Sequence, residues 1–184
     1  MRNIVSFCNC GIAALMLGLG AASAQESADV DTMLSELANP ETSNWRQLER
    51  RIETAWSKSG SASMDLLLQR AQDAMADEEW DTALEHLTAL TDHAPDFAEG
   101  WHARATVFFH KKLYGPAIDD IGRALALNPN HYNALTGLAV MFEEMGLGPQ
   151  ALEIYRMVQQ MHPHRPEIGQ ALIRLEAAHG GTTL

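Results

Sequence analysis

The chain has 184 residues, of which 46% are hydrophobic, and this is enough apolar sequence for one folded domain with a sizeable core. Its 24 acidic side chains outnumber its 13 basic ones, which gives a formal net charge of −11 at pH 7. An acidic chain whose few basic residues form no stripe is poorly suited to nucleic acids and anionic lipid surfaces, so neither is expected as a partner.

Residues 1–24 have the three zones of a secretory signal peptide. Arg2 supplies a positive charge, residues 11–22 form an apolar run, and Ala22-Ser23-Ala24 matches the small-x-small pattern that signal peptidase cleaves. The alternative is an uncleaved membrane anchor, which needs roughly 20 apolar residues, and this run is shorter. We therefore expect export to the periplasm, cleavage after Ala24 and no membrane insertion of the mature chain.

Two helices are predicted in residues 25–63, and both come before a serine-rich linker. They cover Val30 to Leu37 and Ser43 to Ser57. The second has apolar residues at helical spacing, which predicts one buried face. This stripe consists of Trp45, Leu48, Ile52 and Trp56. We interpret the two helices as a degenerate hairpin that seals the N-terminal end of the array that follows.

A 34-residue period runs from residue 64 to residue 165. Three columns keep this spacing: Pro95, Pro129 and Pro163; Ala83, Ala117 and Ala151; and Ala71, Ala105 and Ala139. Proline disfavours helical backbone in the residue before it, so each proline marks a break between units. Internal repeats of this length are typical of stacked helical hairpins, in which each unit buries its apolar face against its neighbours.

The residues at these positions resemble the tetratricopeptide repeat (TPR) family, whose pattern combines large, small and aromatic residues ahead of a proline. The middle unit carries the resemblance through Trp101, Arg104-Ala105, Phe108, Ala117, Ile121 and Pro129. The last unit matches through Leu135, Leu138-Ala139, Phe142, Ala151, Tyr155 and Pro163, and the first unit is looser. The resemblance implies an all-α solenoid of helix-turn-helix repeats at residues 64–97, 98–131 and 132–165. A capping helix is expected at 166–178 and a flexible tail at 179–184.

In such arrays the concave surface, lined by the first helix of each hairpin, is the expected binding site. On the middle and last units it would hold Glu99, His102, Thr106, Phe109, His110, Asn133, Thr136, Val140 and Glu143. None of these is Lys or Arg, so the basic clamp with which part of the family grips a C-terminal carboxylate is not expected. We predict a protein or peptide partner of basic or mixed apolar character. Phe109 would be the aromatic anchor of this surface, unless it packs under a neighbouring helix instead.

No catalytic constellation is evident in the sequence. It contains no Gly-x-Ser-x-Gly motif and no glycine loop that could cradle a phosphate. The two cysteines, Cys8 and Cys10, both precede the predicted cleavage site, so the mature chain would offer no thiol. We therefore expect a non-catalytic protein without a cofactor.

Eight histidines leave a second hypothesis open, an envelope protein that binds a small ligand or a metal. The candidate pairs are His102 with His110 and His162 with His164. A transition-metal site needs three or four ligands, and no third ligand is close in sequence to either pair, so no metal site is predicted. The other histidines, His86, His93, His131 and His179, are interpreted as ordinary surface or packing residues.

Arg104 departs from the family pattern, because an apolar residue is commoner at its place on the buried stripe. A lone buried guanidinium would be expensive. In one branch of the family that the middle unit resembles, such an arginine faces an aspartate on the second helix of the same hairpin. Asp120 occupies that position here, so we predict a structural Arg104–Asp120 ion pair. Arg70 is the equivalent residue of the first unit, where His86 replaces the carboxylate and no pair is expected.

Overall fold

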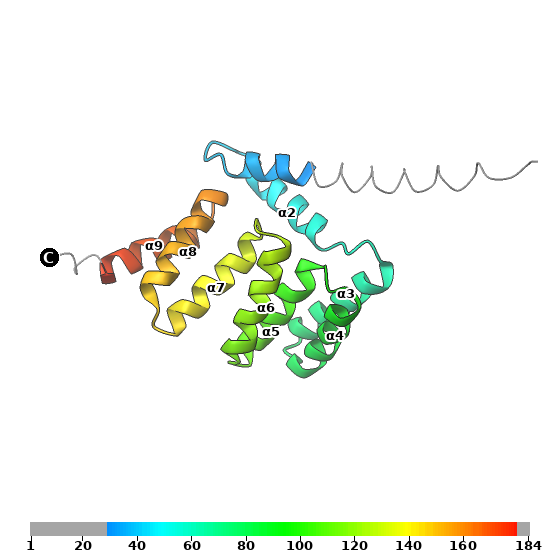
Figure 1. Cartoon of the computed structure of the whole chain (residues 1–184). Coiled ribbons are helices and arrows are strands. Elements are labelled where there is room, and N and C mark those ends of the chain that lie inside the picture. The colour runs from blue at the N-terminus through cyan, green and yellow to red at the C-terminus, as the bar shows by residue number, and fades with distance from the viewer. Residues whose placement is uncertain (1–28, 180–184) are drawn as a thin grey trace, which may run out of the picture.

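Residues 29–179 are the part of the chain that this computed structural model describes, and they consist of α-helices joined by short turns (Figure 1). A first helical segment covers residues 29–37. It is followed by α2 (Trp45–Trp56), α3 (Ala62–Ala76), α4 (Trp80–His93), α5 (Ala98–His110), α6 (Tyr114–Leu127), α7 (Tyr132–Glu144), α8 (Gly148–Met161) and α9 (Pro166–His179). The predicted signal peptide, residues 1–24, lies outside the described residues, and so do residues 180–184 of the predicted tail.

Helices α3 to α8 form three antiparallel hairpins, α3–α4, α5–α6 and α7–α8, which coincide with the three 34-residue units. The small residues of the repeat explain how closely the two helices of a hairpin approach. All six alanines of the two periodic columns are completely buried: Ala71, Ala83, Ala105, Ala117, Ala139 and Ala151. A larger side chain at any of these positions would force the helices apart. The predicted all-α repeat fold is confirmed.

The turn inside each hairpin has the same geometry in all three units. Glu78, Lys112 and Gly146 stand 34 residues apart and have positive φ angles of 58°, 59° and 76°. The next amide in each turn donates a 2.8 Å hydrogen bond to a carbonyl at the end of the preceding helix; the donors are Glu79, Leu113 and Leu147. A left-handed residue followed by such a bond is the Schellman helix stop. The repeat therefore extends to the backbone conformation of its turns.

The N-terminal helices do not stack on the first hairpin, and the prediction that they seal that end is wrong. The buried residues of α2, Leu48 and Ile52, belong to one apolar cluster with residues of α7, α8 and α9. Figure 1 shows these blue and cyan helices along the upper edge, over the hairpin ends. They lie across the loops between successive repeats, because the Trp45 and Trp56 rings of α2 contact side chains of these loops.

Four side chains of α2 and the residues they contact account for this placement. The Trp56 ring stacks on His131 with centroids 4.7 Å apart, and the Trp45 ring stacks on His164 at 5.4 Å. Glu49 accepts a 2.8 Å hydrogen bond from Arg165, just before α9. Glu53 accepts one of 2.8 Å from Asn133, at the start of α7. The N-terminal pair thus holds together the loop edge of the second half of the array.

Helix α9 covers the exposed face of the last hairpin, as predicted for a capping helix. Its buried residues are Ile168, Ala171, Leu172 and Leu175, which join the cluster that also contains Tyr155 and Val158 of α8. Across residues 29–179, no helix combines the length and the hydrophobicity that crossing a membrane requires.

Candidate functional site

The first helices of the middle and last hairpins face each other across one pocket. Its volume is about 250 Å³. It is lined by seven of the nine residues predicted to bind a partner, namely His102, Thr106, Phe109, His110, Asn133, Thr136 and Val140, together with Ile121, Gly137 and Met141. We call this pocket the α5–α7 groove. The sequence could identify these residues because they recur at helical spacing on the faces of α5 and α7 that the core stripe does not use.

The polar groups of the groove are mostly acceptors or rings. The hydroxyls of Thr106 and Thr136 donate to carbonyls of their own helices, at His102 (3.1 Å) and Tyr132 (2.8 Å). A hydroxyl used in this way has only its lone pairs left for a ligand. The groove therefore offers methyl groups, acceptor oxygens and imidazoles to whatever enters it.

Phe109 is half-buried and lies at one end of the groove. Its ring is in edge-on contact with His110 and with Tyr114, at centroid distances of 5.8 and 6.1 Å. The Lys112 ammonium lies 5.0 Å from the centre of the ring. Lys112 also donates to Glu144 at 3.1 Å, so this cation is already paired. Phe109 is thus partly packed on its neighbours and partly available to the groove.

The two acidic residues of the predicted surface, Glu99 and Glu143, do not line the groove with free carboxylates. Glu143 accepts hydrogen bonds from the Tyr155 hydroxyl at 3.1 Å and from Arg174 of α9 at 2.7 Å. Burial raises the pKa of Tyr155, and the charge and hydrogen bond of Glu143 raise it further, to about 12. Glu143 therefore serves to fasten the capping helix.

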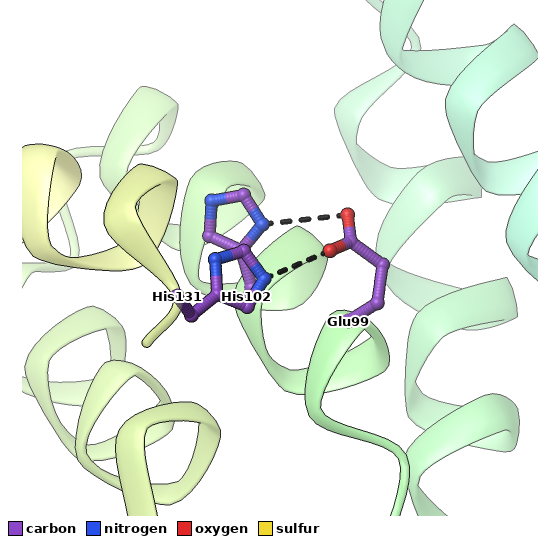
Figure 2. A group of neighbouring side chains, drawn as sticks. All are labelled: Glu99, His102 and His131. Carbon is purple, nitrogen blue, oxygen red and sulfur yellow. Dashed lines mark hydrogen bonds and ion pairs between the residues drawn. The ribbon is translucent and has the colours of Figure 1, made fainter. Parts of the chain in front are cut away.

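Glu99 lies between two imidazoles, and Figure 2 shows how its two carboxylate oxygens are divided between them. The distance from Oε1 to His102 Nδ1 is 3.4 Å, and that from Oε2 to His131 Nε2 is 2.9 Å. Burial raises the pKa of Glu99, but the hydrogen bonds and charges of His102 and His131 outweigh it, and the pKa is about 2. The carboxylate is therefore ionised throughout the physiological range.

His131 is not the ordinary surface or packing residue that the sequence suggested. Its side chain is only 1% exposed. It caps the N-terminus of α7, since its Nδ1 accepts a hydrogen bond of 3.3 Å from the Ala134 amide. Burial lowers its pKa. The Glu-x-x-His spacing of Glu99 and His102 is visible in the sequence, but nothing near His131 marks it as their neighbour.

The histidine pairs that the sequence offered as metal ligands have other partners in the structure. His110 stacks on Trp80 at 4.3 Å, with the rings nearly parallel. His162 is completely buried and its Nε2 lies 3.1 Å from Glu49. The Nε2 of His164 is 3.1 Å from the carbonyl of Asn39. His162 and His164 therefore attach the N-terminal helices to the last repeat.

Arg104 and Asp120 are in direct contact inside the middle hairpin, where the sequence predicted an ion pair. Two nitrogens of Arg104 meet the two carboxylate oxygens at 2.7 and 2.9 Å. The guanidinium also lies over the Trp101 ring, 4.8 Å from its centre. Neither residue lines the α5–α7 groove.

Comparison with known proteins agrees with the geometry. The family model described as Tetratricopeptide repeat matches residues 68–121 and 116–166, more than half of the chain. The chain belongs to the tetratricopeptide repeat family. A TPR repeat-containing protein of Rhizobium etli is 30% identical over 145 residues, which cover 77% of this chain and 70% of that protein.

Solved TPR structures share the fold. The first TPR domain of Spaghetti (RPAP3), bound to the HSP90 peptide SRMEEVD, matches with a TM-score of 0.61 and 20% identity, over 64% of this chain and 93% of that one. The TPR2B domain of yeast Sti1, in a complex with pHsp70, matches with a TM-score of 0.60 and 19% identity, over 65% of this chain and 100% of that one. At these identities the likeness concerns the fold alone.

Proposed function

We propose that this TPR protein is a non-catalytic interaction module that binds a peptide segment of a partner protein in the α5–α7 groove. The observation that carries the proposal is that seven residues selected for groove binding from their helical positions line one pocket of about 250 Å³. Pockets that enclose a drug-sized ligand measure roughly 300–1,000 Å³, so this one is suited to one or two side chains of a longer segment.

The chemistry of the groove favours an apolar side chain flanked by basic ones. The lining contains Phe109, Val140 and Met141 but neither Lys nor Arg. The chain carries a net charge of −11, which attracts a cationic segment over longer distances. The peptide SRMEEVD, which the Spaghetti domain binds, is acidic and ends in a carboxylate. We expect this chain to discriminate against such peptides.

The proposed place of action is the periplasm, after removal of residues 1–24. The support for this part is the order of charge, apolar run and small-x-small site in the sequence. Structural likeness to peptide-bound TPR domains supports the mode of binding and not the compartment.

Selection from a random peptide library on the purified protein tests the proposal. The selected peptides are expected to share an aromatic or aliphatic residue next to Lys or Arg, and SRMEEVD is expected to show no measurable affinity. Recovery of acidic peptides with a free C-terminal carboxylate, or preferential binding of SRMEEVD, would contradict it.

A further inference from the structure

Within residues 29–179, one group of three side chains has the composition and spacing of a metal site, and it adjoins the α5–α7 groove. The ligand atoms of Glu99, His102 and His131 all lie within 4.8 Å of one another. Figure 2 shows both imidazoles directed at the same carboxylate. Two of the three residues lie in the first two turns of α5, and the third is the residue that caps α7.

We propose that Glu99, His102 and His131 bind a divalent transition-metal ion of the zinc class. Two imidazoles and one carboxylate are the protein ligands of several zinc sites that keep a fourth position open. The same donors form the facial triad of non-haem iron. Calcium and magnesium prefer oxygen ligands and match this set poorly. The proposal does not depend on which partner the groove binds.

The three donor atoms are gathered within 4.8 Å of one another, which is wider than the spacing around a bound ion. Ligand atoms 2.0–2.1 Å from a tetrahedral ion are about 3.3 Å from one another. The two nitrogen–oxygen distances in the cluster are 3.4 and 2.9 Å. The imidazole centroids are 4.5 Å apart. Each imidazole now meets a different oxygen of Glu99, so the side chains must rotate and draw together to place three donors around one ion.

The sequence around the first two ligands supports the assignment. Glu99 and His102 form a Glu-x-x-His motif on α5, and this spacing places both side chains on the same helix face. The motif recurs in carboxylate metal sites of helical bundles. His131 is held by Trp56, whose ring stacks on it at 4.7 Å, so the third donor is oriented before any metal arrives.

Two hydrogen bonds of His131 oppose metal binding. The Nδ1 of His131 accepts the Ala134 amide at 3.3 Å, which leaves the ring proton on Nε2, where it is directed at Glu99. An ion at Nε2 displaces this proton, and a neutral ring then carries its proton on Nδ1 and gives up the bond to Ala134. The bond to Ala134 is long, and bonds from the ion to His131 Nε2 and to the Glu99 carboxylate would replace the two hydrogen bonds.

His102 also belongs to the lining of the α5–α7 groove. A bound ion would keep at least one position that these three residues do not fill. Water, or a donor atom of the molecule in the groove, can occupy it. The site would thus add a coordinate bond to recognition at one end of the groove.

Titration of the full chain with Co²⁺, followed by displacement with Zn²⁺, tests the site. The protein should carry no histidine tag and should have Cys8→Ser and Cys10→Ser, because thiols outside the described residues would compete for the ion. We expect one equivalent of Co²⁺ with the intense visible absorption of low-coordinate cobalt. Zn²⁺ should remove this absorption. Absence of a visible spectrum together with no heat of Zn²⁺ binding would overturn the proposal.

Three variants assign the ligands. Glu99→Gln and His102→Gln should each weaken binding at least about tenfold, since even changes outside the first shell have that effect at metal sites. His93→Gln, at the exposed end of α4, is the matched control and should bind like the parent. Saturating Zn²⁺ should raise the melting temperature of the parent and of His93→Gln but not of His102→Gln. Unchanged affinity in both ligand variants, or equal loss in the control, would show that the ion binds elsewhere.

Discussion

Arg104 on α5 and Asp120 on α6 form a bidentate ion pair inside the middle hairpin, with nitrogen–oxygen distances of 2.7 and 2.9 Å. Their side chains are 15% and 7% exposed. A third nitrogen of Arg104 donates to the buried Thr91 hydroxyl on α4, at 2.8 Å. The pair therefore connects two helices of one repeat and also joins that repeat to the one before it.

Asp120→Ala should destabilise the protein by about 3–5 kcal/mol, because it leaves the Arg104 guanidinium buried without its counter-charge. Replacing both residues with leucine should recover much of this loss, since two apolar side chains strand no charge. Arg70→Leu, at the exposed equivalent position of the first unit, should change stability by no more than about 0.5 kcal/mol. Urea unfolding of the four proteins measures these differences. An Asp120→Ala protein as stable as the wild type would mean that the pair contributes nothing.

The repeat could be predicted from the sequence because its determinants are local. Fixed spacing of Ala and Pro specifies where helices approach and where they stop, and the three hairpins follow from it. The Arg104–Asp120 pair could be predicted because the middle unit resembles a branch of the family in which such an arginine faces an aspartate of the same hairpin. The turn conformation at Glu78 and Lys112 was not anticipated, because neither residue is a glycine.

The left-handed residue of each turn provides a second prediction. Gly146→Ala should lower stability by about 1 kcal/mol, because an L residue there has a left-handed backbone that costs about 1–2 kcal/mol. No atom lies within 4 Å of the added methyl group, so the effect reports the backbone alone. Glu78→Gly, the reverse change at the equivalent position, should stabilise by about 0.5–1 kcal/mol after the larger chain entropy of glycine is subtracted. Thermal unfolding of both variants and of the wild type measures these changes in stability. Equal stability of Gly146→Ala and wild type would exclude strain at these turns.

The placement of the N-terminal helices and the Glu99 cluster could not be predicted, because both depend on contacts between distant parts of the chain. Glu53 meets Asn133, and Trp56 meets His131, across more than two repeats of sequence. The apolar stripe of α2 predicts that one face is buried but not which surface buries it. His131 lies in a loop, where helical periodicity gives no direction for a side chain. The groove residues on α5 and α7 could be selected because helical spacing does give that direction.

Attachment of the N-terminal helices should weaken in mild acid. Burial lowers the pKa of His162 from 6.5, and its buried Nδ1 has no hydrogen-bond partner among the described residues. The unfolded chain therefore takes up a proton at a higher pH than the folded chain, so stability is full above about pH 6.5 and falls as the pH drops below it. The facing groups are Glu49, Arg165 and His164, of which Arg165 also disfavours the charged imidazole.

A second loss should follow below about pH 4.5. Burial raises the pKa of Glu49, but hydrogen bonds and charges from Arg165 and His162 bring it below its ordinary value. Stability from this carboxylate is present above the unfolded pKa and disappears as the pH falls through the folded one. The chain has four tryptophans, so the Trp45 signal is taken as the difference in fluorescence between the parent and Trp45→Phe. This difference reports the contacts of Trp45 with His162 and His164 and should follow the first step. His162→Gln, which cannot be protonated, should reduce that step. A fluorescence signal that is flat from neutral pH to about pH 5 would contradict this account.

Export makes a separate prediction about the N-terminus. If Ala22-Ser23-Ala24 is cleaved, the periplasmic protein should begin at Gln25. Ala24→Leu should block processing, because signal peptidase requires a small residue at the cleavage site. Intact-mass analysis of periplasmic and membrane fractions distinguishes the outcomes. Protein with Met1 still present, found only in the membrane fraction, would show that residues 1–24 are an anchor.

The most direct test of the binding account is the affinity of a library-selected peptide for two arginine variants. Thr136→Arg places a long cation inside the α5–α7 groove, whereas Gln159→Arg adds the same charge on the exposed face of α8. Isothermal titration should show at least about a tenfold loss of affinity for Thr136→Arg, which is equivalent to about 1.4 kcal/mol. For Gln159→Arg the binding free energy should change by no more than a few tenths of a kcal/mol. Equal affinities of the wild type and Thr136→Arg, with both proteins folded, would show that the groove is not the binding site.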